Sequence, residues 1–179
     1  MLSSYKTGSY PAEPMAFENY AESVVIDGRH IVFSLWDDDS NSPYDYLRTL
    51  VAHSTYSDTD VFVVCYSITC PLSLEHVKSK WLPEIRSYCP DTPFVLVGTT
   101  SIFTDLRKNS RALEEFKARG GRLVDPARVK EIAKELGAAR VMECSGRNQS
   151  SLKLLVDQSL RLALAARTHV RKTRTVPPS

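Results

Sequence analysis

The sequence predicts an α/β fold with a mostly parallel sheet flanked by helices. Two short, almost continuously apolar runs, residues 60–67 and 93–98, have the pattern of strands that are covered on both faces. Stretches with helical periodicity separate the strand candidates, and this alternation is typical of parallel α/β sheets. The length of 179 residues and the 42% hydrophobic content suit one domain with a sizeable core. They exclude collagen-like, coiled-coil, disordered and membrane-spanning classes.

The first strands are expected to form a hairpin. Residues 24–26 and 31–36 are rich in β-formers and flank Asp27-Gly28, a turn sequence that tolerates positive φ. The two apolar runs follow, and residues 140–144 are the last strand candidate. Ligands of such sheets bind at the carboxyl ends of the strands. Here those ends are Trp36-Asp37, Ser67, Gly98-Thr99 and Cys144-Ser145.

Helical patterns lie between and after the strands. The first covers residues 74–85, with Ser73 as its expected N-cap and Pro83 as a bend or break. A short charged helix over 112–119 ends at Gly120-Gly121. Asp125-Pro126 starts the next helix, which stops at Gly137. The last helix is predicted over residues 152–166.

Charge and cysteine usage suggest how the chain is organised. Residues 161–179 hold five basic and no acidic groups, which leaves 18 basic against 21 acidic residues, or −3, for the rest. We therefore expect a domain over 1–166 and a basic disordered tail over 167–179, which is either simply solvated or in weak contact with anionic membranes. No nucleic-acid partner is expected. The four cysteines show no metal spacing, and Cys65 lies in an apolar run that predicts a core position.

The strand ends and the segments around them resemble the Rho family of small GTPases. Phe17-Glu18-Asn19-Tyr20 is similar to the end of that family's first switch, and Leu35-Trp36-Asp37 to the start of the second. The remaining similar segments follow in family order: residues 44–48, 59–62, 80–85, 89–90, 93–98 and 142–145. Residues 106–122 match the Rho insert, with its helix near 109–119. The resemblance covers roughly residues 1–166.

This resemblance implies a Ras-like P-loop NTPase fold and a guanine-nucleotide switch that controls the actin cytoskeleton, polarity or vesicle traffic. It implies GTP or GDP and Mg²⁺ as ligands, and effectors, exchange factors and GTPase-activating proteins as partners. The residues that would form the effector or regulator surface are Phe17, Glu18, Asn19, Tyr20 and Tyr44. We expect a cytoplasmic protein that can be peripheral at the plasma membrane.

The phosphate loop of the family is absent from this sequence. The motif G-x-x-x-x-G-K-[ST] places backbone N–H groups around the phosphates, and none of the seven glycines has that spacing or precedes a lysine. By resemblance, the first residues align just after that loop, so the fold is expected to lack the first strand as well. Losing about five contacts of ~1.5 kcal/mol each would lower affinity by about five orders of magnitude.

The switch residues of the family are altered too. Met15 stands where the family has a threonine that ligates Mg²⁺, and a thioether is a poor ligand for a hard cation. Asp37 is kept, and by resemblance it holds Mg²⁺ through water. Ser40 replaces a glycine that reports the γ-phosphate, and Asn41 replaces the longer glutamine that orients the attacking water. We therefore expect no hydrolysis.

Base recognition is only partly preserved. Thr99 keeps the first residue of the [NT]-K-x-D motif, but the lysine is lacking. Asp105 either reaches guanine after a short insertion or simply caps a helix. Ser145 and Gly146 match the family loop whose backbone contacts the base. The last cysteine is Cys144, so the family's prenylation box has no counterpart and we expect no prenylation.

The resemblance also predicts a structural consequence. The absent strand would be the centre of the sheet, flanked by the family's third and fourth strands. The chain would then be unstable unless these strands close up or a partner fills the gap. Three hypotheses remain: a pseudo-GTPase interaction module using Tyr20, Tyr44 and the insert helix; a fragment of an active GTPase whose N-terminal exon is missing; or a non-functional relic. We favour the first.

Overall fold

The computed structural model describes residues 1–13, 17, 19–38, 56–99 and 109–173, and contains two separate sheets. Strands β1 (Tyr20–Ile26) and β2 (Arg29–Leu35) form an antiparallel hairpin. Strands β3 (Phe62–Ser67), β4 (Phe94–Thr99) and β5 (Arg140–Cys144) form a parallel sheet in that order. The predicted α/β fold with a parallel sheet is thus confirmed.

The hairpin follows the local sequence closely. Its register pairs Tyr20 with Leu35 and Ile26 with Arg29, so that Asp27-Gly28 forms the tight turn. Asp27 has φ 50° and Gly28 has φ 75°, and these positive angles are the ones such a turn requires. The predicted hairpin is confirmed.

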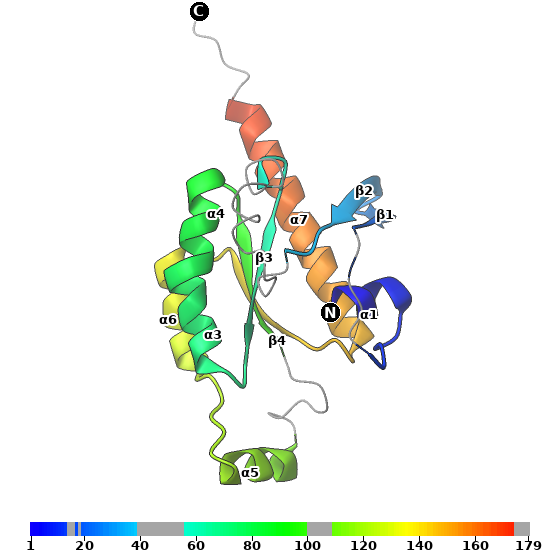
Figure 1. The fold of residues 1–179 in the computed structure, drawn as a ribbon. Helices are drawn as coiled ribbons and strands as arrows, with labels where there is room; N and C mark the ends of the chain where they lie inside the picture. Colours follow the sequence, from blue (N-terminus) through cyan, green and yellow to red (C-terminus); the bar gives the residue numbers. More distant parts are fainter. Residues whose placement is uncertain (14–16, 18, 39–55, 100–108, 174–179) are drawn as a thin grey trace, which may run out of the picture.

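Helices cover the parallel sheet on both faces (Figure 1). One face carries α3 (Pro71–His76), a π-helical segment (Val77–Trp81), α4 (Leu82–Tyr88) and α6 (Pro126–Leu136). The other carries α7 (Gln149–Thr173), with α1 (Leu2–Thr7) packed against it. Helix α5 (Ser110–Ala118) lies apart from the sheet and buries none of its residues. Its range confirms the predicted short charged helix.

The start of α3 differs from the prediction. Cys70 is the N-cap and Pro71 begins the helix, so the assignment of Ser73 as the cap is wrong. Ser73 instead joins the helix to the end of β3, because its hydroxyl donates to the Cys70 carbonyl (2.6 Å) and accepts from the Ser67 amide (2.9 Å). Pro83, expected to bend or break the helix, does not end it: helical backbone continues from Pro71 to Tyr88, with a π-helical turn over Val77–Trp81 just before Pro83 in the first turn of α4.

The strands β3 and β4 have similar compositions but different burial. Every residue from Phe94 to Gly98 is buried, whereas β3 alternates and leaves Val63 41% exposed. The predicted burial of β3 on both faces is therefore wrong, as is the core position of Cys65, which is exposed. The reason is position in the sheet: β4 pairs on both edges and its α7 face is covered by Leu152 and Leu155, while β3 pairs only with β4 among the described strands and lies outside that cluster.

Gly98 shows how tightly the core closes around β4. A Cβ atom there would lie 2.8 Å from the Tyr66 hydroxyl and 3.0 Å from the Ile68 Cγ2 atom. Both side chains are buried in the cluster beneath α3, α4 and α6. The absence of a side chain at residue 98 is what lets the Tyr66 ring lie over its register partner on β4.

Helix α7 extends beyond the boundary expected at residue 166 and reaches Thr173. Two of the five basic groups counted over residues 161–179 form ion pairs. Arg161 donates to both carboxylate oxygens of Asp27 at 2.8 Å, and Arg167 to those of Asp60 at 2.5 and 2.7 Å. The expectation of a disordered tail from residue 167 is therefore wrong up to Thr173, because α7 continues through these residues. No helix in the described part of the chain has the length and apolar character of a membrane span.

Candidate functional site

The carboxyl ends of the three parallel strands meet at one edge. Ser67 of β3 pairs in register with Thr99 of β4, and Thr99 with Cys144 of β5. Two candidate residues, Thr99 and Ser145, are thus brought to the same edge, as expected for a ligand site of such a sheet. Asp37 follows β2 in the other sheet.

The hydroxyl groups of β3 and β4 at this edge are hydrogen-bonded within the protein. Thr99 Oγ1 donates to the Tyr66 carbonyl at 3.0 Å. The hydroxyls of Ser67 and Thr69 lie 2.9 Å apart and share one hydrogen bond. These groups stabilise the strand ends, and a ligand would have to displace those bonds to use them.

The loop after β5 is ordered by its own hydroxyls and by the start of α7. The Ser145 amide donates to Ser151 Oγ (3.2 Å), and the Arg147 amide donates to Ser145 Oγ (3.3 Å). Asn148 caps the helix, because its Oδ1 atom accepts from the Ser151 amide at 3.1 Å. Thr99 and Ser145 are therefore placed near each other with their polar atoms already engaged.

Gly146 is buried beneath two residues from the start of the chain. A Cβ atom at Gly146 would lie 3.3 Å from the Tyr10 ring and 3.4 Å from Ser4 Oγ. The Arg147 guanidinium lies 4.4 Å from the centre of the same ring. Ser4 Oγ is buried and, within the described residues, has no hydrogen-bond partner. Sequence reasoning missed Ser4 and Tyr10, since no local pattern links them to a loop more than 130 residues away.

Asp37 is exposed just beyond the end of β2. Its carboxylate lies within electrostatic reach of Cys65. Among the described residues no three His, Cys, Asp or Glu side chains cluster as metal ligands. Mg²⁺ commonly takes one or two carboxylates and completes its shell with water and phosphate oxygens. The described residues therefore do not form a metal site on their own.

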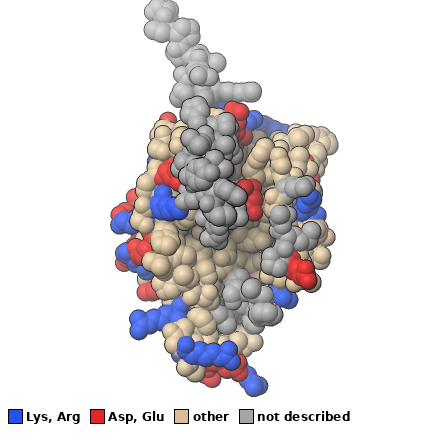
Figure 2. Space-filling model, viewed as in Figure 1, with Lys and Arg blue, Asp and Glu red and all other residues tan. Residues whose placement is uncertain are grey.

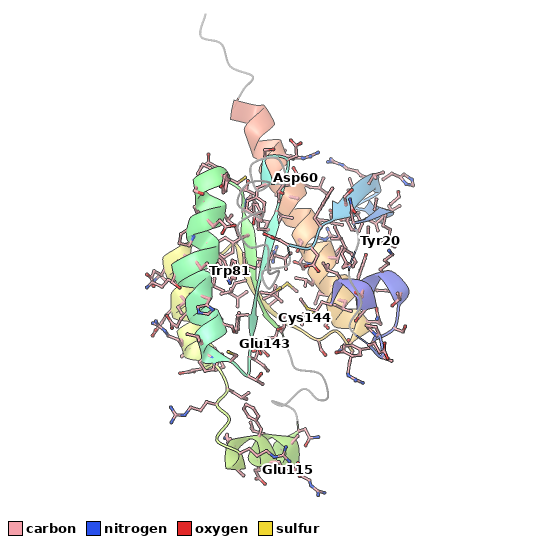
Figure 3. The ribbon with its side chains drawn as sticks, viewed as in Figure 1. Tyr20, Asp60, Trp81, Glu115, Glu143 and Cys144 are labelled. Atoms are coloured by element: carbon pink, nitrogen blue, oxygen red, sulfur yellow. The ribbon has the colours of Figure 1, made fainter. Side chains whose placement is uncertain are left out.

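The residues of the predicted effector surface differ in their exposure, and some lie outside the described part of the chain. Phe17 is half-buried and Asn19 is exposed. Tyr20 packs edge-on against Tyr5, with ring centres 6.3 Å apart, and beneath the Lys6 ammonium (Figure 3). Tyr20 therefore has a structural contact as well as a partly exposed ring. Glu18, Asn41, Tyr44 and Asp105 lie outside the described residues.

A second surface was not anticipated as a site. Val25, Val32 and Trp36 are 61%, 78% and 65% exposed. Residues 32 and 36 share one face of β2 and its extension because side chains alternate along a strand. Val25 lies on the same outer face, since its register partner His30 has the same parity as Val32. The spacing of Val32 and Trp36, which places both on one face of an alternating strand, was the sequence signal that could have identified this apolar face.

Charged groups are mixed over the face of the molecule drawn in Figure 2, with basic and acidic side chains together over α5.

The described residues form an α/β domain whose parallel strands end at one edge, as in nucleotide-binding folds. Among the described residues, that edge contains no set of backbone N–H groups arranged to bind phosphates. A family model described as the Ras family matches residues 1–165. This match spans most of the 179 residues, and the chain belongs to the Ras family of small GTPases.

Proposed function

We propose that this protein is a Rho-type pseudo-GTPase, an interaction module in small-GTPase signalling that does not switch on GTP. The Ras-family match supports a role among effectors, exchange factors and GTPase-activating proteins. The Rho assignment is supported by α5, which occupies the position of the Rho insert in the sequence.

The loss of switching is supported chiefly by the internal hydrogen bonds at the carboxyl edge of the parallel sheet. The sequence has no phosphate-binding glycine motif. At the edge where a nucleotide would lie, Thr99 Oγ1, the Ser67 hydroxyl and the Ser145 amide are all used in internal hydrogen bonds. A triphosphate needs several converging N–H donors and a lysine, and the described residues of this edge offer no such set.

The exposed outer face of the hairpin supports the interaction role. Val25, Val32 and Trp36 place three large apolar side chains on one face, and such faces mark protein-binding surfaces. On this proposal regulators contact the hairpin rather than a nucleotide-dependent loop. The actin cytoskeleton is the expected setting, by the Rho resemblance, and the cytoplasm is the expected location. Basic residues near the end of α7, with Lys172 among them, would add weak contact with anionic membranes.

Fluorescent GTP-analogue titration tests this proposal. With 2 mM Mg²⁺ or with chelator, we expect no saturable binding at or below about 100 μM protein, because the ~7 kcal/mol of phosphate contacts is missing. Binding with micromolar or tighter affinity that requires Mg²⁺ would overturn it and would favour the alternative, an active GTP-binding member of the family. Asp37 and the Ser145-Gly146 loop are the features that favour this alternative.

A further inference from the structure

A polar cavity lies where the first helix, the hairpin and the last helix meet. Its volume is about 390 Å³, within the roughly 300–1,000 Å³ that is typical of ligand sites. In Figure 1 the three elements lie together beside the parallel sheet. The carboxyl edge with Thr99 and Ser145 contributes no residue to the cavity. The walls come from the end of α1, the start of β1 and the first turns of α7, and they include Lys6, Tyr20, Glu22, Gln149 and Lys153.

Hydrogen bonds and a ring contact fix these walls. The Tyr5 hydroxyl donates to Glu22 Oε2 at 3.0 Å and thereby joins α1 to β1. Gln149 Nε2 donates to the Ser4 carbonyl at 2.9 Å and joins α7 to α1. The rings of Tyr5 and Tyr20 meet edge-on, with centres 6.3 Å apart. The cavity is therefore formed before any ligand enters.

Two exposed lysines line the cavity, and neither has an acidic partner within the described part of the chain. The Lys6 ammonium lies 5.9 Å from the centre of the Tyr20 ring, a neutral contact. The carboxylate one turn beyond Lys153 on α7 belongs to Asp157, and it binds Arg161 instead at 2.9 Å. Lysine ammonium groups are common ligands of phosphate groups, and here two of them lack a counter-ion.

The charge of the lining residues favours an anion. All of these residues are described, and Glu22 supplies their only carboxylate, so two positive charges face one negative charge. The Glu22 carboxylate already accepts the hydrogen bond from Tyr5. A phosphate monoester carries about −1.5 to −2 charge at pH 7 and three acceptor oxygens. It can therefore accept from both lysines and offset both charges, whereas a carboxylate offsets one.

We propose that this cavity binds a phosphorylated side chain of a partner protein, with the phosphate held by Lys6 and Lys153 and the carbon stem against the Tyr20 ring. A bare phosphate ion would leave most of the volume unfilled and would make no use of the ring. The inference goes beyond the proposed function, because the cavity lies apart from the edge at which a nucleotide would bind.

The place of the cavity along α7 favours a protein over a lipid headgroup. Lys153 and Lys172 are 19 residues apart in this helix, which corresponds to about 28 Å along its axis. The basic residues expected to contact anionic membranes lie near the end of α7. A membrane that is bound there would leave the cavity at the opposite end of the helix.

A titration followed by the backbone amide resonances tests the proposal. The probes are two capped tripeptides, glycine-phosphoserine-glycine and glycine-phosphotyrosine-glycine, and the controls are the same peptides without phosphate. We expect saturable shifts of the amides of residues 5–8, 20–22 and 149–153 with at least one phosphopeptide, and none with the controls. Added chloride should weaken the binding because it screens the exposed lysines. Inorganic phosphate should bind more weakly than the better phosphopeptide.

Matched variants separate this cavity from general surface charge. Lys153→Gln removes one of its cations, and Lys130→Gln removes an exposed lysine of α6 that is outside the cavity. We expect K153Q to weaken phosphopeptide binding about fivefold or more, and K130Q to leave it unchanged. Lys153→Arg keeps the charge and should retain binding. Circular dichroism establishes that the variants fold.

A further variant gives a readout that a merely structural role would not move. Glu22→Gln keeps an acceptor for the Tyr5 hydroxyl but removes the negative charge from the cavity wall. We expect E22Q to tighten phosphopeptide binding about twofold or more, because the phosphate no longer faces a like charge.

The proposal is overturned if neither phosphopeptide shifts these amides at about 10 mM, if the unphosphorylated peptides bind equally, or if K130Q and K153Q weaken binding alike. Binding of inorganic phosphate as tight as that of the phosphopeptides would identify free phosphate as the ligand. Binding to phosphatidic acid vesicles alone would identify a membrane. Either result would equally overturn it, as would shifts confined to Thr99 and Ser145. GTP-analogue binding with intact phosphopeptide binding refutes the pseudo-GTPase proposal alone.

Discussion

β3 and β4 are neighbouring strands of one parallel sheet, and they differ in what surrounds them. β4 is buried from Phe94 to Gly98, between two strands and two helical layers, whereas β3 exposes Val63 and Cys65 on the side where its second edge has no described strand. Both strands are apolar in sequence. The difference shows that a strand's position in the sheet and the helix cover of each face, and not composition, decide whether an apolar run becomes a core strand.

The comparison is tested most strongly by truncating one buried and one open side chain. Leu96→Ala should lower the free energy of unfolding by about 2–5 kcal/mol, because Leu96 has no exposed surface in β4. Val63→Ala should cost about 1 kcal/mol or less, since Val63 already contacts solvent. Urea unfolding followed by circular dichroism measures both. Equal losses would contradict the difference between the strands.

A pair of glycines separates crowding from backbone strain. Gly98→Ala places a Cβ 2.8 Å from the Tyr66 hydroxyl, and we expect a loss of about 1–3 kcal/mol from overpacking. Gly28→Ala meets no atom within 4 Å but has φ 75°, so its cost should be about 1 kcal/mol and confined to the hairpin. Thermal unfolding gives the ranking. A larger loss of stability for G28A than for G98A would show that the core around β4 accommodates an added methyl group more easily than its packing indicates.

The thiol of Cys65 tests how strongly the surroundings of β3 desolvate an exposed residue. Its pKa, raised to about 12 mainly by burial, should make alkylation by iodoacetamide slow at pH 8 and faster as the pH approaches 12, compared with a C65S control that retains the other three cysteines. Above about pH 9 the unfolded state loses this proton first, so stability should fall as the pH rises from 9 towards 12. Rapid labelling of Cys65 at pH 8 would show that the residue lies on open surface.

The smallest effect is expected at the ion pairs of α7. Arg161→Gln removes the contacts to Asp27 and Asp157, and Arg111→Gln removes an i,i+4 pair with Glu115 on the isolated helix α5. We expect R161Q to speed hydrogen exchange in the hairpin, an effect that high salt reproduces in the wild type. R111Q should leave hairpin exchange unchanged. If R161Q also leaves hydrogen exchange in the hairpin unchanged, then packing alone holds the hairpin in place.

Local features of this fold could be predicted from the sequence. Asp27-Gly28 specifies the hairpin because its turn needs positive φ. Asp125-Pro126 starts α6 and Gly137 ends it, since capping and proline geometry are local. Ser73 failed as a cap because the side chain reached Ser67 instead. Local chemistry also placed Thr99 and Ser145 at strand ends.

Features set by distant contacts could not be predicted. Helix α7 continues beyond residue 166. Its ion pairs join residues far apart in the sequence: Arg161 and Asp27 are 134 residues apart, and Arg167 and Asp60 are 107 apart. The cover of Gly146 by Tyr10 likewise joins the two ends of the domain. The exposure of Cys65 depends on which strands meet, a property that no single run of residues encodes.

Backbone amide resonances of the Thr99 and Ser145-Gly146 segments test the loss of nucleotide switching most directly. In a titration with GTP and Mg²⁺ up to millimolar concentration, we predict that these resonances stay in place, because the polar groups of this edge are bonded to the protein itself. Saturable shifts of the same amides at micromolar GTP would contradict the account.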